Sequence, residues 1–189
     1  TIESIQHFLT MPLQMETSYL DRFKLFFASA PYFSKDYANL SQLFKQYLEN
    51  PIPEQYLREL LNTMTAFAEY CPNFFLNQTD FIIPFLINVV TKSTDATIRN
   101  CALFCIESIV IGLSIPFQSA PENCQPIIQL LIQIISEIND NIPLEYDANC
   151  NEPCVTAQLI IDRMGQEFLD IPFFISFLFI DNEYDEDSY

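Results

Sequence analysis

The chain has 189 residues, a net charge of −17 and only two glycines, where average usage predicts about 13. This glycine content excludes a glycine-rich phosphate-binding loop and disfavours β folds with many tight hairpins, and the negative charge disfavours binding to nucleic acid or to an anionic membrane. No apolar run reaches the ~18–20 residues of a membrane-spanning helix, and because the chain starts at Thr1 and stops in an acidic stretch, we expect an internal fragment of a longer protein.

Apolar residues recur at helical spacing along most of the chain and predict a series of paired helices. Two helices are expected in the amino-terminal part, over residues 2–10 and 18–30. The first helix of each later pair is expected over 35–50, 78–93 and 121–140, with one more near residue 171. The second helix of each pair is expected over 53–71, 95–112 and 152–169.

Residues with known preferences for helix ends support these boundaries. Asp95 is placed to cap the start of one helix, and Gly112 stands where that helix is expected to end. Pro53 and Pro153 suit the first helical position, which needs no backbone N–H. A β interpretation is open locally for Ile- and Val-rich segments such as 81–90, but the regular spacing and the scarcity of glycine favour helices.

The three second helices align with one another in four columns of apolar residues. Equivalent positions are 42 and then 55 residues apart, and the first helices start about 43 residues apart. This period is that of the helical hairpin in HEAT-type repeats, at ~40–47 residues. The columns are Leu60, Ala102 and Ala157; Met64, Ile106 and Ile161; Phe67, Ile109 and Met164; and Cys71, Leu113 and Phe168.

The period predicts an all-α fold, a HEAT-repeat α-solenoid of about four antiparallel helix pairs in a right-handed superhelical stack. The whole chain, 1–189, is expected to form one array. Its repeats are predicted at 1–34 (partial), 35–77, 78–120, 121–170 and 171–189 (partial). An acidic insertion over 141–152 interrupts the fourth repeat, and such interruptions of a regular array are frequent sites of function.

Two cysteine pairs, Cys101 with Cys105 and Cys150 with Cys154, have two interpretations. Their spacing permits a zinc site shared between adjacent repeats, whereas buried thiols are common as small apolar residues in helical cores. The pairs are not equivalent repeat positions and the single histidine, His7, is remote, so we expect buried thiols, no metal and no cofactor. We do not expect an enzyme, and a metal-dependent or thiol enzyme is the least favoured hypothesis. The cysteine content indicates a reducing compartment.

Three segments carry a family resemblance. LLNTMTAFAEYCPNFF is a second helix followed by a proline and an aromatic residue, and RNCALFCIESI contains R-x-x-A-L-x-x-I. EPCVTAQLIIDRMGQEF follows the acidic insertion and carries an I-D-R-M core at 161–164. In their order and spacing, over residues 37–168, these segments resemble the importin-β karyopherins, specifically the importin-five class.

This resemblance implies a nuclear transport receptor that shuttles between cytoplasm and nucleus through the nuclear envelope. Such receptors bind basic cargo signals on an acidic concave surface lined by second helices, and the implied partners are basic cargo proteins with nuclear localisation signals, Ran-GTP and nucleoporins. A structural HEAT-repeat scaffold for a multiprotein complex is the alternative, and Arg99 has a second interpretation as a structural residue paired with an acid of the neighbouring repeat. The candidate contact residues, which are polar positions off the columns or in the acidic loop, are Glu69, Asn100, Glu107, Glu145, Asp147, Glu152, Asp162 and Arg163.

Overall fold

A computed structural model describes residues 42, 44, 45, 48, 49, 52–137 and 152–168. Within this part, every regular element is helical, which confirms the all-α prediction there. The helices predicted over 2–10, over 18–30 and near 171 lie outside the described residues, as does most of the acidic insertion. The described elements, in chain order, are α4 (Glu54–Tyr70), η2 (Pro72–Phe74), α5 (Thr79–Lys92), α6 (Ala96–Gly112), α7 (Ser114–Ser119), η3 (Pro121–Cys124), α8 (Gln125–Ser136) and α9 (Pro153–Glu167).

The helix ends follow from local chemistry. The Asp95 carboxylate accepts hydrogen bonds from the backbone N–H groups of Thr97 and Ile98, at 2.7 and 3.4 Å, so the predicted cap of α6 is confirmed. The predicted helix over 121–140 begins later than expected, because α8 starts at Gln125 with Pro126 in its first turn, where the missing N–H is tolerated. The short helix α7 was not predicted, since a six-residue segment gives too little periodicity.

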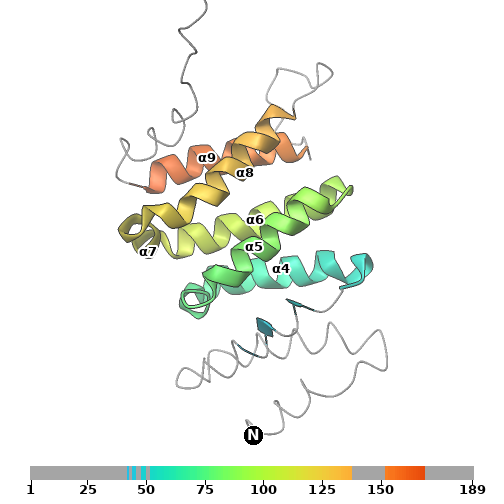
Figure 1. The fold of residues 1–189 in the computed structure, drawn as a ribbon, viewed down its shortest axis with the longest axis horizontal. Helices are drawn as coiled ribbons and strands as arrows, with labels where there is room; N and C mark the ends of the chain where they lie inside the picture. The colour runs from blue at the N-terminus through green and yellow to red at the C-terminus, as the bar shows by residue number, and fades with distance from the viewer. Residues whose placement is uncertain (1–41, 43, 46–47, 50–51, 138–151, 169–189) are drawn as a thin grey trace, which may run out of the picture.

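The long helices form two layers (Figure 1). In the first layer, α6 packs between α4 and α9. The second layer consists of α5, which packs on α6, and α8, which packs on α9 and touches α5. All three predicted second helices therefore lie in one layer, and the first helices α5 and α8 lie in the other. No helix in the described part is long and apolar enough to cross a membrane.

The core lies between these layers, and the predicted columns build it. Eleven of the twelve column residues are buried, and the twelfth, Cys71, is half-buried. The second layer contributes a buried face of α5 around Leu86 and one of α8 around Leu131. Edge-to-face contacts of Phe67 with Phe74, whose ring centroids are 5.3 Å apart, close the core at the end of α4.

Arg99 joins the ends of three helices. Its Nε–H donates to the carbonyl oxygen of Val90 in the last turn of α5, at 3.0 Å. Its Nη2 lies 2.6 Å from Oε2 of Glu137, which caps the carboxyl end of α8. Carbonyls in the last turn of a helix lack intrahelical partners, so this side chain stabilises an end of α5 while it links α6 to α8. The structural interpretation of Arg99, as the partner of an acid in another helix pair, is confirmed.

Candidate functional site

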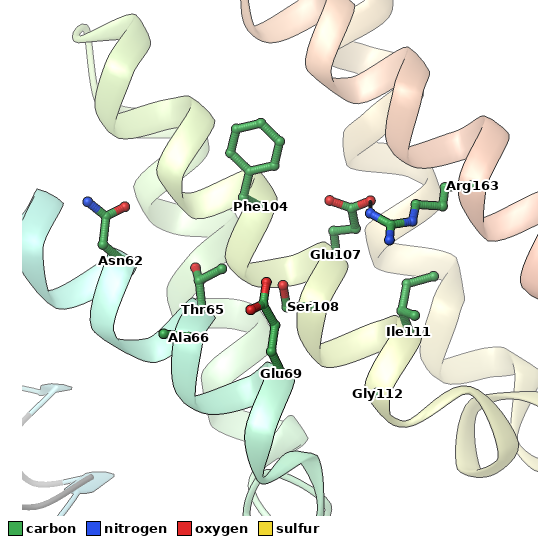
Figure 2. A pocket seen from close by; sticks show the side chains of 10 residues that line it. All are labelled: Asn62, Thr65, Ala66, Glu69, Phe104, Glu107, Ser108, Ile111, Gly112 and Arg163. Carbon is green, nitrogen blue, oxygen red and sulfur yellow. Dashed lines mark hydrogen bonds and ion pairs between the residues drawn. The ribbon is translucent and has the colours of Figure 1, made fainter. Parts of the chain in front are cut away.

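A groove of about 660 Å³ runs along the first layer, on the side of α4 and α6 that the core columns leave open, with a wall from α9 (Figure 2). Asn62 and Glu69 line it from α4, Phe104 and Ile111 from α6, and Arg163 from α9. A side chain from each of three packed helices therefore faces one hollow. This arrangement can hold an extended polypeptide segment, because a groove between side chains of parallel helices accommodates a chain lying across them.

The lining residues occupy repeating positions off the core columns. Asn62 of α4 and Phe104 of α6 are equivalent by the 42-residue offset, and so are Glu69 and Ile111. The helical period carries these positions to the side of each helix opposite the second layer. The repeat offset that brings the column residues together in the core therefore also brings the groove residues to equivalent positions on the open face of the first layer.

The electrostatics of the groove centre on two carboxylates. Oε1 of Glu107 accepts a hydrogen bond from Nη1 of Arg163, at 2.9 Å, and this ion pair links α6 to α9. The Glu107 side chain is only 11% exposed, whereas that of Arg163 is 61% exposed. Glu69 is exposed and has no ion-pair partner among the described residues. The groove thus offers one carboxylate that is already neutralised and one that is available.

The groove also has an apolar component. Phe104 is 45% exposed, although it is a large aromatic side chain in the middle of α6. Ile111 is half-buried and lies on the same side of α6, two turns further along. Burial of this apolar surface by a ligand would supply affinity, and the neighbouring carboxylate would select a ligand of opposite charge.

Three of the candidate contact residues, Glu69, Glu107 and Arg163, meet in this groove. Asp162 is exposed next to Arg163, and its Oδ1 accepts a hydrogen bond from Nε2 of Gln158, at 3.0 Å, within α9. Glu152 is exposed at the start of α9, away from the groove lining. The remaining two acids, Glu145 and Asp147, lie outside the described residues.

Asn100 differs from the expectation, because it is buried at 7% exposure and does not face an open surface. The reason is the central place of α6, which packs against α4, α5 and α9 and so has more of its circumference covered than α4 has. Arg58 occupies the equivalent position of α4 and is exposed. Burial at this position thus depends on the neighbours of the helix.

Sequence analysis missed the apolar members of the groove, Phe104 and Ile111. They could not be distinguished from the other apolar residues of α6, because its segment ALFCIESIVIG is rich in hydrophobic residues around its whole circumference. A helix with that composition either is buried on all sides or leaves apolar side chains exposed. The signal that identifies Phe104 is its position two residues after Ala102, which places it about 200° around the helix, on the side of α6 opposite the columns.

Of the two cysteine thiols of α6, that of Cys105 lies in the core and that of Cys101 is half-buried beside it. Burial raises the pKa of Cys105 to about 12, against a smaller lowering effect of a hydrogen bond with the Thr65 side chain. Burial also raises the pKa of Cys101. Metal ligation and nucleophilic attack both use the thiolate, which is scarce at neutral pH at these positions. Among the described residues, no group of three or more His, Cys, Asp or Glu side chains is arranged to hold a metal ion, and Cys150 lies outside that part.

Comparisons of the chain with protein-family models, curated proteins and solved structures found no match. The likeness to the importin-β karyopherins therefore rests on the sequence segments alone. In the R-x-x-A-L-x-x-I segment, Ala102, Leu103 and Ile106 are fully buried, and Arg99 joins helix ends. These motif residues contribute to packing, so they bear on the fold, whereas function depends on the groove.

Proposed function

We propose that the chain is a segment of a HEAT-type α-solenoid that binds a basic polypeptide in the groove of α4, α6 and α9, as part of an importin-β-like nuclear transport receptor. The solenoid part is supported by the buried columns at a repeating offset and by the separation of first and second helices into two layers. Stacked helical hairpins bury their apolar faces in this way. The second helices then line one continuous surface, on which the groove lies.

One observation carries the binding proposal: the groove combines Glu69, which lacks an ion-pair partner among the described residues, with the exposed ring of Phe104. Full burial of an apolar side chain stabilises by about 1.5–3 kcal/mol, and Phe104, which is 45% exposed, can gain about half of that, whereas an exposed ion pair contributes about 0–1 kcal/mol. The apolar anchor therefore supplies most of the affinity. The carboxylate selects segments in which Lys or Arg lies close to that anchor.

The charge of the whole chain favours the same class of partner. A net charge of −17 steers cationic segments toward the protein and repels acidic ones. Cargo proteins with basic localisation signals, Ran-GTP, nucleoporins and movement between cytoplasm and nucleus belong to this proposal through the sequence resemblance.

A structural scaffold is a second candidate, and two exposed side chains favour it, one at the carboxyl end of α4 and one in α7, directly after the carboxyl end of α6. Tyr70 is 88% exposed and Ile115 is 74% exposed. These two helix ends lie at one edge of the layer, because Gly112 at the end of α6 packs against Pro72 directly after α4. A permanently bound subunit covering this edge would bury both side chains.

The binding proposal is tested with the 189-residue chain and a fluorescein-labelled peptide of alternating arginine and leucine, followed by fluorescence anisotropy. Glu69→Gln is expected to weaken binding a few-fold, and Phe104→Ser about three- to tenfold, because each ~1.4 kcal/mol corresponds to a factor of ten. Asp80→Asn, which removes an exposed acid from α5 in the other layer, is the matched control.

Equal affinities for Glu69→Gln, Phe104→Ser and Asp80→Asn would show that the peptide binds elsewhere and would remove the groove from the proposal. Release of bound peptide by Ran-GTP in a pull-down with the same chain is expected for a transport receptor. Peptide binding that Ran-GTP leaves unchanged favours the scaffold instead.

A further inference from the structure

The ion pair in the groove is unequal in a way that bears on ligand exchange. Glu107 is the buried member, at 11% side-chain exposure, and Arg163 is the exposed member, at 61%. A buried carboxylate without a cation is strongly destabilising. An arginine that is mostly in water loses little when its ion pair opens. The buried carboxylate of Glu107 therefore needs a cationic partner, but that partner need not be Arg163.

We propose that Arg163 acts as an internal competitor, which occupies Glu107 in the empty groove and is replaced there by a guanidinium group of the bound polypeptide. This inference rests on the proposed function, and it adds a specificity-determining residue to that binding site. The ligand class becomes an arginine-bearing segment rather than a generally basic one. Arg163 moves into solvent when the ligand binds.

The geometry supports exchange rather than a fixed link. One contact between the side chains, Nη1 to Oε1 at 2.9 Å, joins Arg163 to Glu107, and the strongest arginine–carboxylate pairs instead use two parallel N–H···O bonds. Both side chains line the groove itself, so an incoming guanidinium reaches the carboxylate without passing through the core (Figure 2). A ligand that makes the two-bond arrangement gains over the resident partner.

The Arg163 side chain is already 61% exposed, so it can turn further into solvent when the ion pair opens. Glu69 approaches the groove from α4, on the other side from Arg163 (Figure 2). A second cation of the ligand can therefore pair with Glu69 while the first occupies Glu107.

The exchange favours arginine over lysine. A guanidinium is planar, is weakly hydrated and presents its donors in a fork, so it can satisfy a nearly buried carboxylate through two hydrogen bonds. The lysine ammonium is strongly hydrated and acts as a point charge. Replacing Arg163 by a lysine of the ligand thus exchanges a guanidinium for a group that matches the carboxylate less well.

The test compares peptide affinities of four proteins, all as the 189-residue chain: wild type, Arg163→Gln, Glu107→Gln and the double variant. The probes are the fluorescein-labelled arginine–leucine peptide, its lysine–leucine counterpart and a neutral citrulline–leucine counterpart. Arg163→Gln is expected to bind the arginine peptide about three- to tenfold more tightly, because the competitor is gone. Arg58→Gln is the matched control, since it removes an exposed cation of the same layer that does not line the groove.

The double variant separates competition from simple repulsion between cations. With Glu107→Gln as background, Arg163→Gln is expected to leave affinity unchanged, because the contested carboxylate is absent. If Arg163→Gln still raises peptide affinity in the Glu107→Gln background, or raises it equally for the arginine and lysine peptides, the effect is repulsion between cations and the inference is overturned. Weaker binding by Arg163→Gln, with the wild-type circular dichroism spectrum retained, also overturns it and leaves the proposed function standing.

If Arg163→Gln does not fold, Arg163→Lys is measured in its place, because lysine keeps a cation beside Glu107 but one that matches the carboxylate less well. Its affinity for the arginine peptide is expected to rise about two- to threefold, and an unchanged or lower affinity refutes competition. Binding of none of the peptides to wild type or to any variant overturns the proposed function together with this inference.

Discussion

The two glycines of the chain are expected to respond in opposite ways to the same substitution, Gly→Ala. Both lie within helices, Gly112 at the last position of α6 and Gly165 in the last turn of α9. Neither has a positive φ angle, so alanine suits the backbone at both positions. The difference lies in the space that the new methyl group would enter.

At Gly165, a Cβ meets nothing within 4 Å, and the substitution only improves helix propensity. Gly165→Ala is therefore expected to raise the free energy of unfolding by about 0.5–1 kcal/mol. At Gly112, the Cβ lies 2.6 Å from Cβ of Pro72 and 3.4 Å from the carbonyl oxygen of Ala68. Proline cannot turn its ring away, so the helices must separate, at a cost of about 1–3 kcal/mol. After the propensity gain of about 0.5–1 kcal/mol is subtracted, Gly112→Ala is expected to lower stability by up to about 2.5 kcal/mol.

Urea unfolding followed by circular dichroism at 222 nm measures both changes. With a slope of about 1–3 kcal/mol per M, each kcal/mol moves the midpoint by roughly 0.3–1 M. The midpoint is expected to rise for Gly165→Ala and to fall for Gly112→Ala. A rise for Gly112→Ala would refute the close approach between the end of α6 and η2, and with it the packing of these two helix ends at one edge.

Two further predictions concern buried polar groups. Arg99→Ala is expected to lower stability by about 1–3 kcal/mol in the same urea assay, because it removes a charged hydrogen bond to Val90 as well as the ion pair. Glu137→Gln changes only the exposed partner of that pair and is expected to cost less than about 1 kcal/mol. Equal losses of stability in the two variants would contradict this order. Burial raises the pKa of Cys105 from 9.0 to about 12, so its neutral thiol favours the folded state fully below pH 9, and stability is expected to fall by about 1.4 kcal/mol per pH unit above it. Cys105→Ala is expected to show a shallower decline between pH 8 and pH 10 in unfolding measurements, and an identical slope would argue against a buried thiol.

Helix type, helix order and the core columns were predictable from the sequence, because they depend on the period of the apolar residues. The offsets of 42 and 55 residues brought Met64, Ile106 and Ile161 to equivalent positions, and all three are buried. Helix boundaries were less predictable where proline acts locally, as at Pro126. The groove was predictable only in part, since exposure off the columns depends on which helices pack beside each position, and Asn100 is buried for that reason.

The contrast between core and groove positions supports the proposed binding role of the groove. At the core columns, equivalent residues of α4, α6 and α9 are alike, because each must fill the same space between two layers. At the groove positions, equivalent residues differ in chemistry, as with Asn62 and Phe104, or Glu69 and Ile111. A surface that only needed to be solvated would be polar at all of them, yet Phe104 and Leu159 share one position and are 45% and 43% exposed. Apolar and acidic side chains therefore line the same groove, and this combination suits the proposed ligand, which carries both apolar and basic residues.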